Sequence, residues 1–302
     1  MDKQSKIILI SGPTASGKSS FAVKIAKKIN GEIINADSMQ VYRKFKILTA
    51  RPNQKGQKNI KHHMYGFVDL NKKFSTGHWL NTAIKKIKQI KKRKKIPIIV
   101  GGTGLYFQSL INGLVKIPKI PLKFRNKVRM IQKKEGQKKF YKKLLKIDPA
   151  IKDRFDPNDI QRTIRAFEIK SFTKISMYEW INKTKSEFRE DEFLKLYIDF
   201  KREDLIKRIS LRSIKMMKEG AIKEVKNFIK SKIKKDLSVN RVIGIDELTQ
   251  YLEEKINLDR AHELISIKTR QYAKRQATWA RSRMTSWEKI NPIKIAEYLK
   301  KL

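Results

Sequence analysis

The segment Gly12–Ser19 has the residue types and the spacing of a loop that binds phosphate. It reads GPTASGKS, in which two glycines separated by four residues are followed by Lys and Ser, the Walker A pattern. Glycines let backbone N–H groups face an anion, Lys18 adds a positive charge, and the hydroxyl of Ser19 can bind Mg²⁺. The motif specifies phosphate but not ATP. We predict a phosphate loop formed by Gly12, Pro13, Thr14, Ala15, Ser16, Gly17, Lys18 and Ser19, with Ser19 as the metal ligand.

Asp37 is the second candidate for chemistry. It lies in Asn35–Tyr42, directly after the short strand-like run Glu32–Asn35. Parallel α/β sheets bind ligands outside the carboxyl ends of their strands, so we expect Asp37 on the same edge as the phosphate loop. A carboxylate there can accept a proton from a substrate. It can equally cap a helix, for which Asp is favoured, and position alone leaves both roles open.

Thr103 belongs to a third segment of this kind, Gly101–Tyr106, which follows the β-branched run Ile96–Val100. A P-loop hydrolase or kinase often has an Asp at the end of such a strand, where it holds Mg²⁺ or its water. Here the strand ends in Gly-Gly followed by a hydroxyl, which counts against ordinary nucleotide hydrolysis. A tight turn explains the glycines but not Thr103.

Two helical segments carry side chains that suit RNA. Gln161 and Arg165 are four residues apart and share one helix face, where Gln can address an adenine edge and Arg a phosphate or guanine. Cations beside an aromatic ring also fit an RNA backbone and an unstacked base. Solvated polar helix faces remain the alternative for both segments. The second segment has a stripe, with Trp279 alongside, made of Arg270, Lys274, Thr278 and Arg281.

These segments need a parallel sheet to bring them together. Strand-like runs at Lys6–Ile10, Glu32–Asn35 and Ile96–Val100 alternate with helical periodicity, which predicts a P-loop-like α/β fold: a parallel sheet with helices on both faces. A proline-punctuated stretch and helical patterns follow, before Lys195–Phe200 indicates a strand that returns to the sheet. We expect a first core part at 1–116, an all-helical insertion at 117–195, and a second core part at 196–302.

Composition bounds the function more loosely. The chain has 302 residues and no cysteine, which excludes disulfides and thiolate metal sites. Its longest apolar runs are about five residues, far short of the roughly 20 that span a bilayer, and its N-terminus lacks the features of a signal peptide. We therefore expect a cytoplasmic protein with no membrane partner. The net charge of +43 permits a polyanionic partner, although an AT-rich genome that over-uses Lys and Ile codons would also contribute. His62-His63 lacks matching ligands, which disfavours a zinc site.

Nine motifs follow one another along the chain: GPTASGKS, NADSMQVY, TARP, HHMYGFVD, GGTGLY, DIQRTIRAFE, MKEGAIKEV, RVIGIDEL and TRQYAKRQATWAR. In this order they resemble the tRNA dimethylallyltransferase family, also called tRNA isopentenyltransferases, from Ile8 to about Arg281. The phosphate loop alone is unspecific, whereas the other eight in sequence are very specific. The resemblance implies transfer of a dimethylallyl group from its diphosphate to N6 of the adenosine just 3′ of the anticodon in tRNA.

The resemblance also implies roles for single residues. Asp37 would take the proton of the adenosine amine, Thr103 would hydrogen-bond near the reacting centre, and Lys18 and Arg212 would lie near the diphosphate, whose departure Mg²⁺ at Ser19 would assist. The residues implied to contact tRNA are Asp37, Ser38, Met39, Gln40, Thr103, Arg125, Gln161, Arg162, Thr163, Ile164, Arg165, Arg241, Val242, Ile243, Gly244, Ile245, Asp246, Lys274, Arg275, Gln276, Ala277, Thr278, Trp279, Ala280 and Arg281.

Three positions depart from the family pattern. Leu48 and Ile245 stand where the family usually has Gly and Tyr, and Phe172-Thr173-Lys174 replaces a Thr-Gly-Lys turn. We expect Leu48 to shift the backbone beside the site and Ile245 to remove a stacking ring. The alternative functions are a P-loop kinase of a small metabolite and a non-catalytic RNA-binding protein. The leading hypothesis is a monomer that acts on tRNA and dimethylallyl diphosphate.

Overall fold

The computed structural model describes residues 6–301 of the chain. It contains two compact units, Met1–Ile111 together with Phe188–Leu302, and Asn112–Glu187. The second unit begins and ends a few residues before the limits of 117 and 195 expected from the sequence. One reason is that Phe188 already contacts Phe193 of the returning strand, with ring centroids 6.1 Å apart. Within residues 6–301, none of the helices is long and apolar enough to cross a membrane.

The first unit is built around one six-stranded sheet in which every strand pairing is parallel. The strand order is β3-β2-β4-β1-β5-β6. Ser11 pairs with Gly101 and Asn35 pairs with Val100, so the carboxyl ends of three neighbouring strands lie side by side. The strands are β1 (Ile7–Ser11), β2 (Gly31–Asn35), β3 (His62–His63), β4 (Ile96–Gly101), β5 (Phe193–Ile198) and β6 (Glu288–Ile290).

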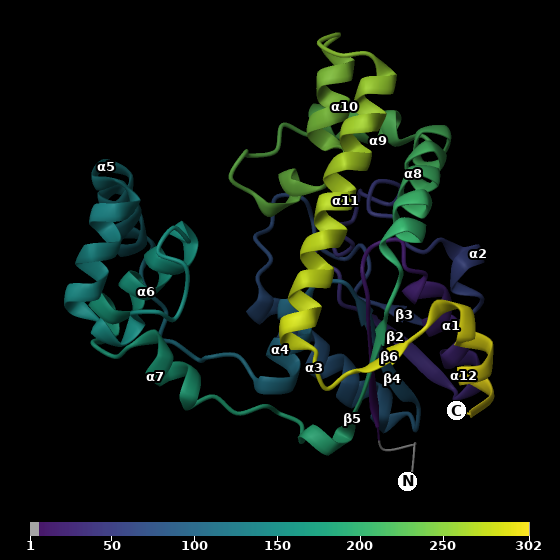
Figure 1. The fold of residues 1–302 in the computed structure, drawn as a ribbon, viewed down its shortest axis with the longest axis horizontal. Coiled ribbons are helices and arrows are strands. Elements are labelled where there is room, and N and C mark those ends of the chain that lie inside the picture. The colour runs from purple at the N-terminus through teal and green to yellow at the C-terminus, as the bar shows by residue number, and fades with distance from the viewer. Residues whose placement is uncertain (1–5, 302) are drawn as a thin grey trace. The chain divides into compact units, whose positions relative to one another are not determined.

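Helices cover both faces of this sheet. On one face lie α1 (Lys18–Lys28) and α12 (Ile295–Lys301), and on the other lie α3 (Thr76–Lys92) and α4 (Gly104–Asn112) (Figure 1). Successive strand residues point to opposite faces, so each face has its own apolar set. The set that packs against Phe21 and Ile25 of α1 includes Ile8, Ile10, Ile33 and Ile98. The set of opposite parity, equally buried, includes Ile7, Leu9, Ile34 and Ile99.

A second hydrophobic core joins the later helices to the loop that follows β2. The helices outside the sheet layers are α2 (Gln54–Gln57), α8 (Arg202–Lys218), α9 (Ala221–Lys230), α10 (Ile245–Leu252) and α11 (Leu258–Arg283). Phe45 and Leu48 of the loop pack with Phe228, Leu248 and Ile265 of α9, α10 and α11. Because α11 runs from this core down to the sheet (Figure 1), it can present side chains to the sheet's carboxyl edge.

The second unit, whose residues 112–187 are all described, is helical throughout its regular elements. These are α5 (Leu122–Ile147), α6 (Ile160–Thr173) and α7 (Met177–Asn182), besides a short 3-10 turn. The backbone of α5 breaks at Gly136, where φ is 76° and ψ is 164°. Val128 and Phe140 of α5 pack against Ile164 of α6. A parallel α/β sheet with a helical insertion, the fold class predicted from the sequence, is therefore confirmed.

Candidate active site

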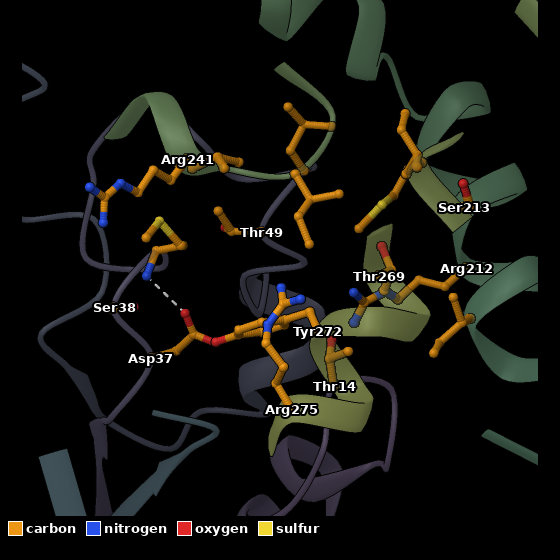
Figure 2. A pocket seen from close by; sticks show the side chains of 17 residues that line it. Thr14, Asp37, Ser38, Thr49, Arg212, Ser213, Arg241, Thr269, Tyr272 and Arg275 are labelled. Carbon is orange, nitrogen blue, oxygen red and sulfur yellow. Dashed lines mark hydrogen bonds between the residues drawn. The ribbon is translucent and has the colours of Figure 1, made fainter. Parts of the chain in front are cut away.

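A cavity of about 280 Å³ opens in the first unit beside the carboxyl ends of the strands. Side chains point into it from the loop after β2, from α8 and from α11 (Figure 2). Four of the polar lining residues are not singled out by the sequence reasoning: Thr49, Ser213, Thr269 and Tyr272. The expected site residues that line the cavity are Thr14, Asp37, Ser38, Met39, Arg212, Arg241, Val242, Ile243 and Arg275.

The phosphate loop, Gly12–Ser19, has the features of an anion site. Gly17 has φ 87°, a left-handed conformation suited to glycine, and directly precedes α1. The phosphate loop therefore leads directly into the N-terminus of α1, where the backbone N–H groups of the first turn have no partner within the helix. Lys18 Nζ donates to the carbonyl of Pro13 at 3.2 Å. Ser16 Oγ is buried and has no hydrogen-bond partner among residues 6–301. A lysine, a helix N-terminus and an orphaned hydroxyl together suit a phosphate group.

Lys18, Asp37 and Arg212 act on one another electrostatically. Burial lowers the pKa of Lys18 to about 8, while the negative charge of Asp37 raises this pKa and the guanidinium of Arg212 lowers it. Burial likewise lowers the pKa of Arg212, and Asp37 opposes that shift. These mutual effects require the three side chains to be near each other. Two cations and one carboxylate leave an excess of positive charge beside the phosphate loop.

Asp37 is held by its neighbours on both sides. The side chain of Asn35, which is 0% exposed, accepts a hydrogen bond from Asp37 N at 2.9 Å and donates one to the Asp37 carbonyl at 3.0 Å. Asp37 Oδ1 accepts from the backbone N–H groups of Met39 at 2.9 Å and Gln40 at 3.3 Å. The carboxylate also points toward Tyr272 in the cavity (Figure 2). Asp37 therefore has the capping bonds of a turn and, in addition, access to a ligand.

Thr103 connects the loops that follow β2 and β4. Its Oγ1 accepts from Ser38 N at 3.0 Å, and its own N–H donates to the carbonyl of Ala36 at 3.2 Å. It also shares a hydrogen bond with Tyr272 of α11. Burial and the negative charge of Asp37 raise the pKa of Tyr272, which keeps its phenol protonated. Thr103 thus lies next to Asp37 without lining the cavity itself.

Gln276 of α11 has a role that the sequence reasoning missed. Its Oε1 accepts from Thr14 N at 2.8 Å, and its Nε2 donates to the carbonyl of Gly102 at 2.9 Å. A Cβ on Gly102 would lie only 2.1 Å from that Nε2, so glycine is needed for this approach. Gln276, expected to contact tRNA, therefore connects the phosphate loop to the end of β4.

The wall of the cavity near Leu48 is held by a carboxylate of α9. Glu224 accepts the backbone N–H groups of Lys46 at 2.6 Å, Ile47 at 3.1 Å and Leu48 at 2.9 Å. Gln40, one of the residues expected to contact tRNA, instead donates its Nε2 to the carbonyl of Thr49 at 2.8 Å. These bonds fix the loop whose side chains form this wall.

Two of the departures from the family pattern, Leu48 and Ile245, are buried in the same hydrophobic core. Leu48 is 6% exposed, lines the cavity, and packs against Gly244, where an added Cβ would be 2.6 Å from Leu48 Cδ2. Gly244 has φ 106°. Ile245 is buried in the core of α8 to α11, so an aromatic ring at this position would enlarge a core residue. Asp246 is exposed and pairs with Lys268 at 3.1 Å.

The outer face of α11 carries the cations expected there. Arg281 donates to Thr278 Oγ1 at 3.2 Å. Trp279 packs against Gly104, where an added Cβ would be 2.3 Å from the indole ring, so this side of the ring is occupied. Ala280 is buried. The exposed residues of this face are Arg270, Lys274, Thr278 and Arg281, whereas Arg275 is exposed on the side of the helix that lines the cavity.

Some of the residues of the second unit that are expected to contact tRNA are buried, and the others are exposed or partly exposed. Thr163 is buried and its hydroxyl donates to the carbonyl of Asp159 at 2.8 Å, which is a bond within the first turn of α6. Ile164 belongs to the core between α5 and α6. Neither of these two side chains faces solvent. The residues that are exposed or partly exposed are Arg125, Gln161, Arg162 and Arg165.

The histidine pair has a structural environment. His63 Nε2 lies 2.6 Å from the buried carboxylate of Glu32, which also accepts from Arg93 Nη2 at 2.7 Å. Burial opposes ionisation of Glu32, but the hydrogen bonds from Arg93 and His63 outweigh it and lower the pKa of Glu32. The contact between His63 and Glu32 joins the edge strand β3 to β2. Across residues 6–301, no group of three or more His, Cys, Asp or Glu residues could hold a metal ion.

A Walker A loop that joins a buried parallel strand to a helix, at the carboxyl edge of a sheet covered on both faces, defines a P-loop type of protein. The cavity beside this loop is lined by Asp37, from the loop after β2, and by three arginines, Arg212, Arg241 and Arg275. The chain belongs to the IPP transferase family, whose model matches residues 40–283.

Individual relatives agree with this membership. The chain is 76% identical over 302 residues to the tRNA dimethylallyltransferase of Pelagibacter ubique (strain HTCC1062), covering 100% of this chain and 96% of the relative. It is 37% identical over 294 residues to the tRNA dimethylallyltransferase of Allorhizobium ampelinum, covering 97% of each. Among solved structures, it resembles a eukaryotic dimethylallyltransferase acting on tRNA, with a TM-score of 0.83 and 31% identity over 95% of this chain and 74% of that one. It also resembles the full-length tRNA isopentenylpyrophosphate transferase of Bacillus halodurans, with a TM-score of 0.71 and 30% identity over 98% and 95%.

Proposed function

We propose that the chain is a tRNA dimethylallyltransferase. It transfers the dimethylallyl group of dimethylallyl diphosphate to N6 of the adenosine 3′ of the anticodon. The observation that carries the proposal is that Asp37 and Arg212 line one cavity beside the phosphate loop, whose Lys18 interacts electrostatically with both. The 76% identity with a relative of that name, over the whole chain, supports the same reaction.

The displacement has two charge requirements that these residues meet. The carbon–oxygen bond of the diphosphate ester breaks while a bond forms between that carbon and N6 of adenine. Negative charge develops on the departing diphosphate, where the N–H groups of the phosphate loop, Lys18 and Arg212 stabilise it. The exocyclic amine is a poor nucleophile, and Asp37 accepts one of its protons as the new bond forms. Thr103 and Asn35 position the Asp37 loop through the hydrogen bonds to Ser38 N and Asp37 N.

The start of α1 fits a Mg²⁺ ion that accompanies the diphosphate. Ser19 lies in the first turn of α1 and is partly exposed, three residues after Ser16, whose hydroxyl is orphaned. Mg²⁺ commonly keeps waters and binds substrate phosphate oxygens with few protein ligands, so a single hydroxyl is a sufficient protein contribution. When bound, the ion would neutralise charge on the leaving group.

The tRNA partner explains surfaces that a metabolite kinase would not need. The target adenosine lies in a stacked anticodon loop and must be turned out of the stack to reach Asp37, at a cost of a few kcal/mol. Exposed cations on α11 and Arg241 at the cavity are placed to bind the backbone around such a base. We propose that the protein acts in the cytoplasm and as a monomer.

One assay tests the reaction against its alternatives. Purified protein is incubated with Mg²⁺, radiolabelled dimethylallyl diphosphate and an unmodified tRNA that has three consecutive adenosines at and beside the target position. A tRNA with guanosine at the target position is the matched control. Label is expected in the first tRNA and not in the second. Phosphorylation of a small substrate by ATP without prenyl transfer would favour the kinase, and salt-sensitive tRNA binding without chemistry would favour an RNA-binding protein.

A further inference from the structure

Ala15, in the middle of the phosphate loop, has a backbone conformation that alanine rarely adopts. Its φ is 64°, which lies in the left-handed region. The Cβ atom of alanine is crowded in that region, whereas glycine adopts the same conformation without this cost. Gly17 of the same loop is also left-handed, with φ 87°. A strained conformation persists only where the surrounding structure holds it, so Ala15 needs contacts from outside the loop.

Two such contacts hold Ala15. Its side chain packs against an apolar cluster of α8 and α11 that consists of Leu205, Ile209 and Ala273. Its carbonyl accepts a hydrogen bond from Arg208 Nε of α8 at 2.8 Å. The first contact uses the methyl group that glycine lacks, which gives alanine an advantage at this position. The second contact fixes the orientation of the peptide unit that follows Ala15.

Arg208 is itself held in place, on a side of the loop away from the reacting groups. Its guanidinium carbon lies 5.1 Å from the centroid of the Phe200 ring, which is a cation–π contact. A Cβ added at Gly17 would lie 3.4 Å from Arg208 Nη2, so the guanidinium also lies against the end of the loop. Arg208 and Gly17 line a second cavity of about 320 Å³, whose lining includes neither Asp37 nor Arg212.

We propose that Arg208 is a positioning residue, which holds the phosphate loop in its diphosphate-binding conformation through the carbonyl of Ala15. The inference rests on the proposed function, because it takes the loop to bind a diphosphate, and it extends that function to a residue outside the loop. A loop that is already held loses less freedom when the anion binds. Without the bond from Arg208, Ala15 can leave the left-handed region, and only a fraction of the molecules then has the binding conformation.

Arg208→Met tests the bond, because it removes every donor and keeps an unbranched stem. We expect the affinity for inorganic diphosphate with Mg²⁺, measured by calorimetry, to fall roughly tenfold. In prenyl transfer, KM for dimethylallyl diphosphate should rise by a similar factor while kcat stays within about threefold, because the substitution leaves the Asp37 loop intact. Lys207→Met is the matched control. It removes the same charge from the preceding, exposed position of α8, and it should change either quantity by less than about twofold.

Ala15→Gly separates positioning from direct attraction. Glycine adopts the left-handed conformation without strain, so a loop with glycine here depends less on Arg208. In the Ala15→Gly chain, Arg208→Met should therefore weaken diphosphate binding by only about threefold, and the double-mutant cycle measures the difference. If Arg208 instead attracted the diphosphate directly with its charge, the loss would be the same roughly tenfold in both chains. Because Arg208 is exposed, its substitution should move the thermal midpoint by no more than about 2 °C.

Equal losses for Arg208→Met in the two backgrounds would overturn the inference, as would equal effects of Arg208→Met and Lys207→Met. Diphosphate binding is measured without tRNA, so it is read separately from the reaction. A chain that transfers the dimethylallyl group yet shows additive effects loses only this inference. A chain that shows the non-additive loss but no transfer keeps the positioning role of Arg208 and loses the proposed reaction.

Discussion

Asp37 has two functions in the structure that a substitution can separate. Its Oδ1 accepts the N–H groups of Met39 and Gln40, which is a structural role, and its carboxylate faces the cavity, where it would accept a proton. Asp37→Asn keeps an oxygen that can accept both N–H groups but removes the basic carboxylate. Asp37→Ala removes both. Comparison of the two variants therefore measures each role alone.

The magnitudes differ enough to be distinguished. Loss of a general base costs about 10²–10⁴-fold in turnover, so both variants should lose that much. Loss of the capping oxygen costs about 1 kcal/mol, so only Asp37→Ala should unfold at a lower temperature, by roughly 2 °C for a chain of this size. Affinity for tRNA should remain within about threefold in both, because the substitution leaves the cationic surfaces intact.

Single-turnover prenyl transfer, with enzyme in excess over labelled tRNA, isolates the chemical step from product release. Calorimetry supplies the unfolding temperatures and anisotropy supplies the tRNA affinities. If Asp37→Asn turned over at more than about one tenth of the normal rate, the carboxylate would not be the base. If Asp37→Asn lost as much stability as Asp37→Ala, the loss of turnover would report a disordered loop, and the reasoning would also fail.

Three further outcomes follow from the same contacts. Because burial lowers the pKa of Lys18 to about 8, affinity for dimethylallyl diphosphate measured by calorimetry should fall roughly tenfold from pH 7 to pH 9. Between this pKa and the ordinary value of 10.5, the unfolded chain binds more protons than the folded chain. The contribution of Lys18 to the free energy of unfolding therefore rises with pH across that window. Gly102→Ala should displace Gln276 from Thr14 N and weaken the same affinity by about tenfold, and an unchanged affinity would show that Gln276 does not hold the phosphate loop. Glu32→Gln should lower the free energy of unfolding by about 3 kcal/mol at neutral pH, measured in urea. The pKa of Glu32 is lowered in the fold, so the stabilisation by its carboxylate is lost as pH falls through that folded pKa. The free energies of unfolding of the variant and the unaltered protein should therefore converge in acid.

The central strands could be predicted because their signal is local. β1 and β4 are short, largely apolar buried runs, and β2 has Ile33 and Ile34 at its centre; all three end directly before polar segments. The edge strands lack that signal. β3 has two residues, and in β6 only Ile290 is buried, next to exposed Glu288 and Lys289. Both strands form because each pairs with a neighbouring strand of the sheet. The local sequence pattern contains no information about that pairing.

The loops that meet at the site could also be predicted, but their internal contacts could not. Strand ends determine that Asp37 and the phosphate loop share one edge. The contact between Gln276 and Thr14 joins residues 262 positions apart, and Glu224 reaches the Leu48 loop from α9. A glutamine that binds RNA and a glutamine that binds backbone have the same local sequence, since the difference lies in which distant loop the fold places beside it.

The sequence of α11 nevertheless contains a second pattern, besides the cationic stripe, that indicates a site. Thr269, Tyr272 and Gln276 are spaced by three and four residues, so they share the helix face opposite the stripe. A surface helix should be apolar on the face that it buries, whereas this face carries a hydroxyl, a phenol and an amide. Buried polar groups need internal partners, so polar residues at core-facing spacing predict a polar site beneath the helix. In the structure, Thr269 and Tyr272 line the cavity and Gln276 binds the loops beside it. Under the proposed function, the outer stripe and the inner face of one helix would therefore serve two ligands, a polyanion outside and the reacting groups within.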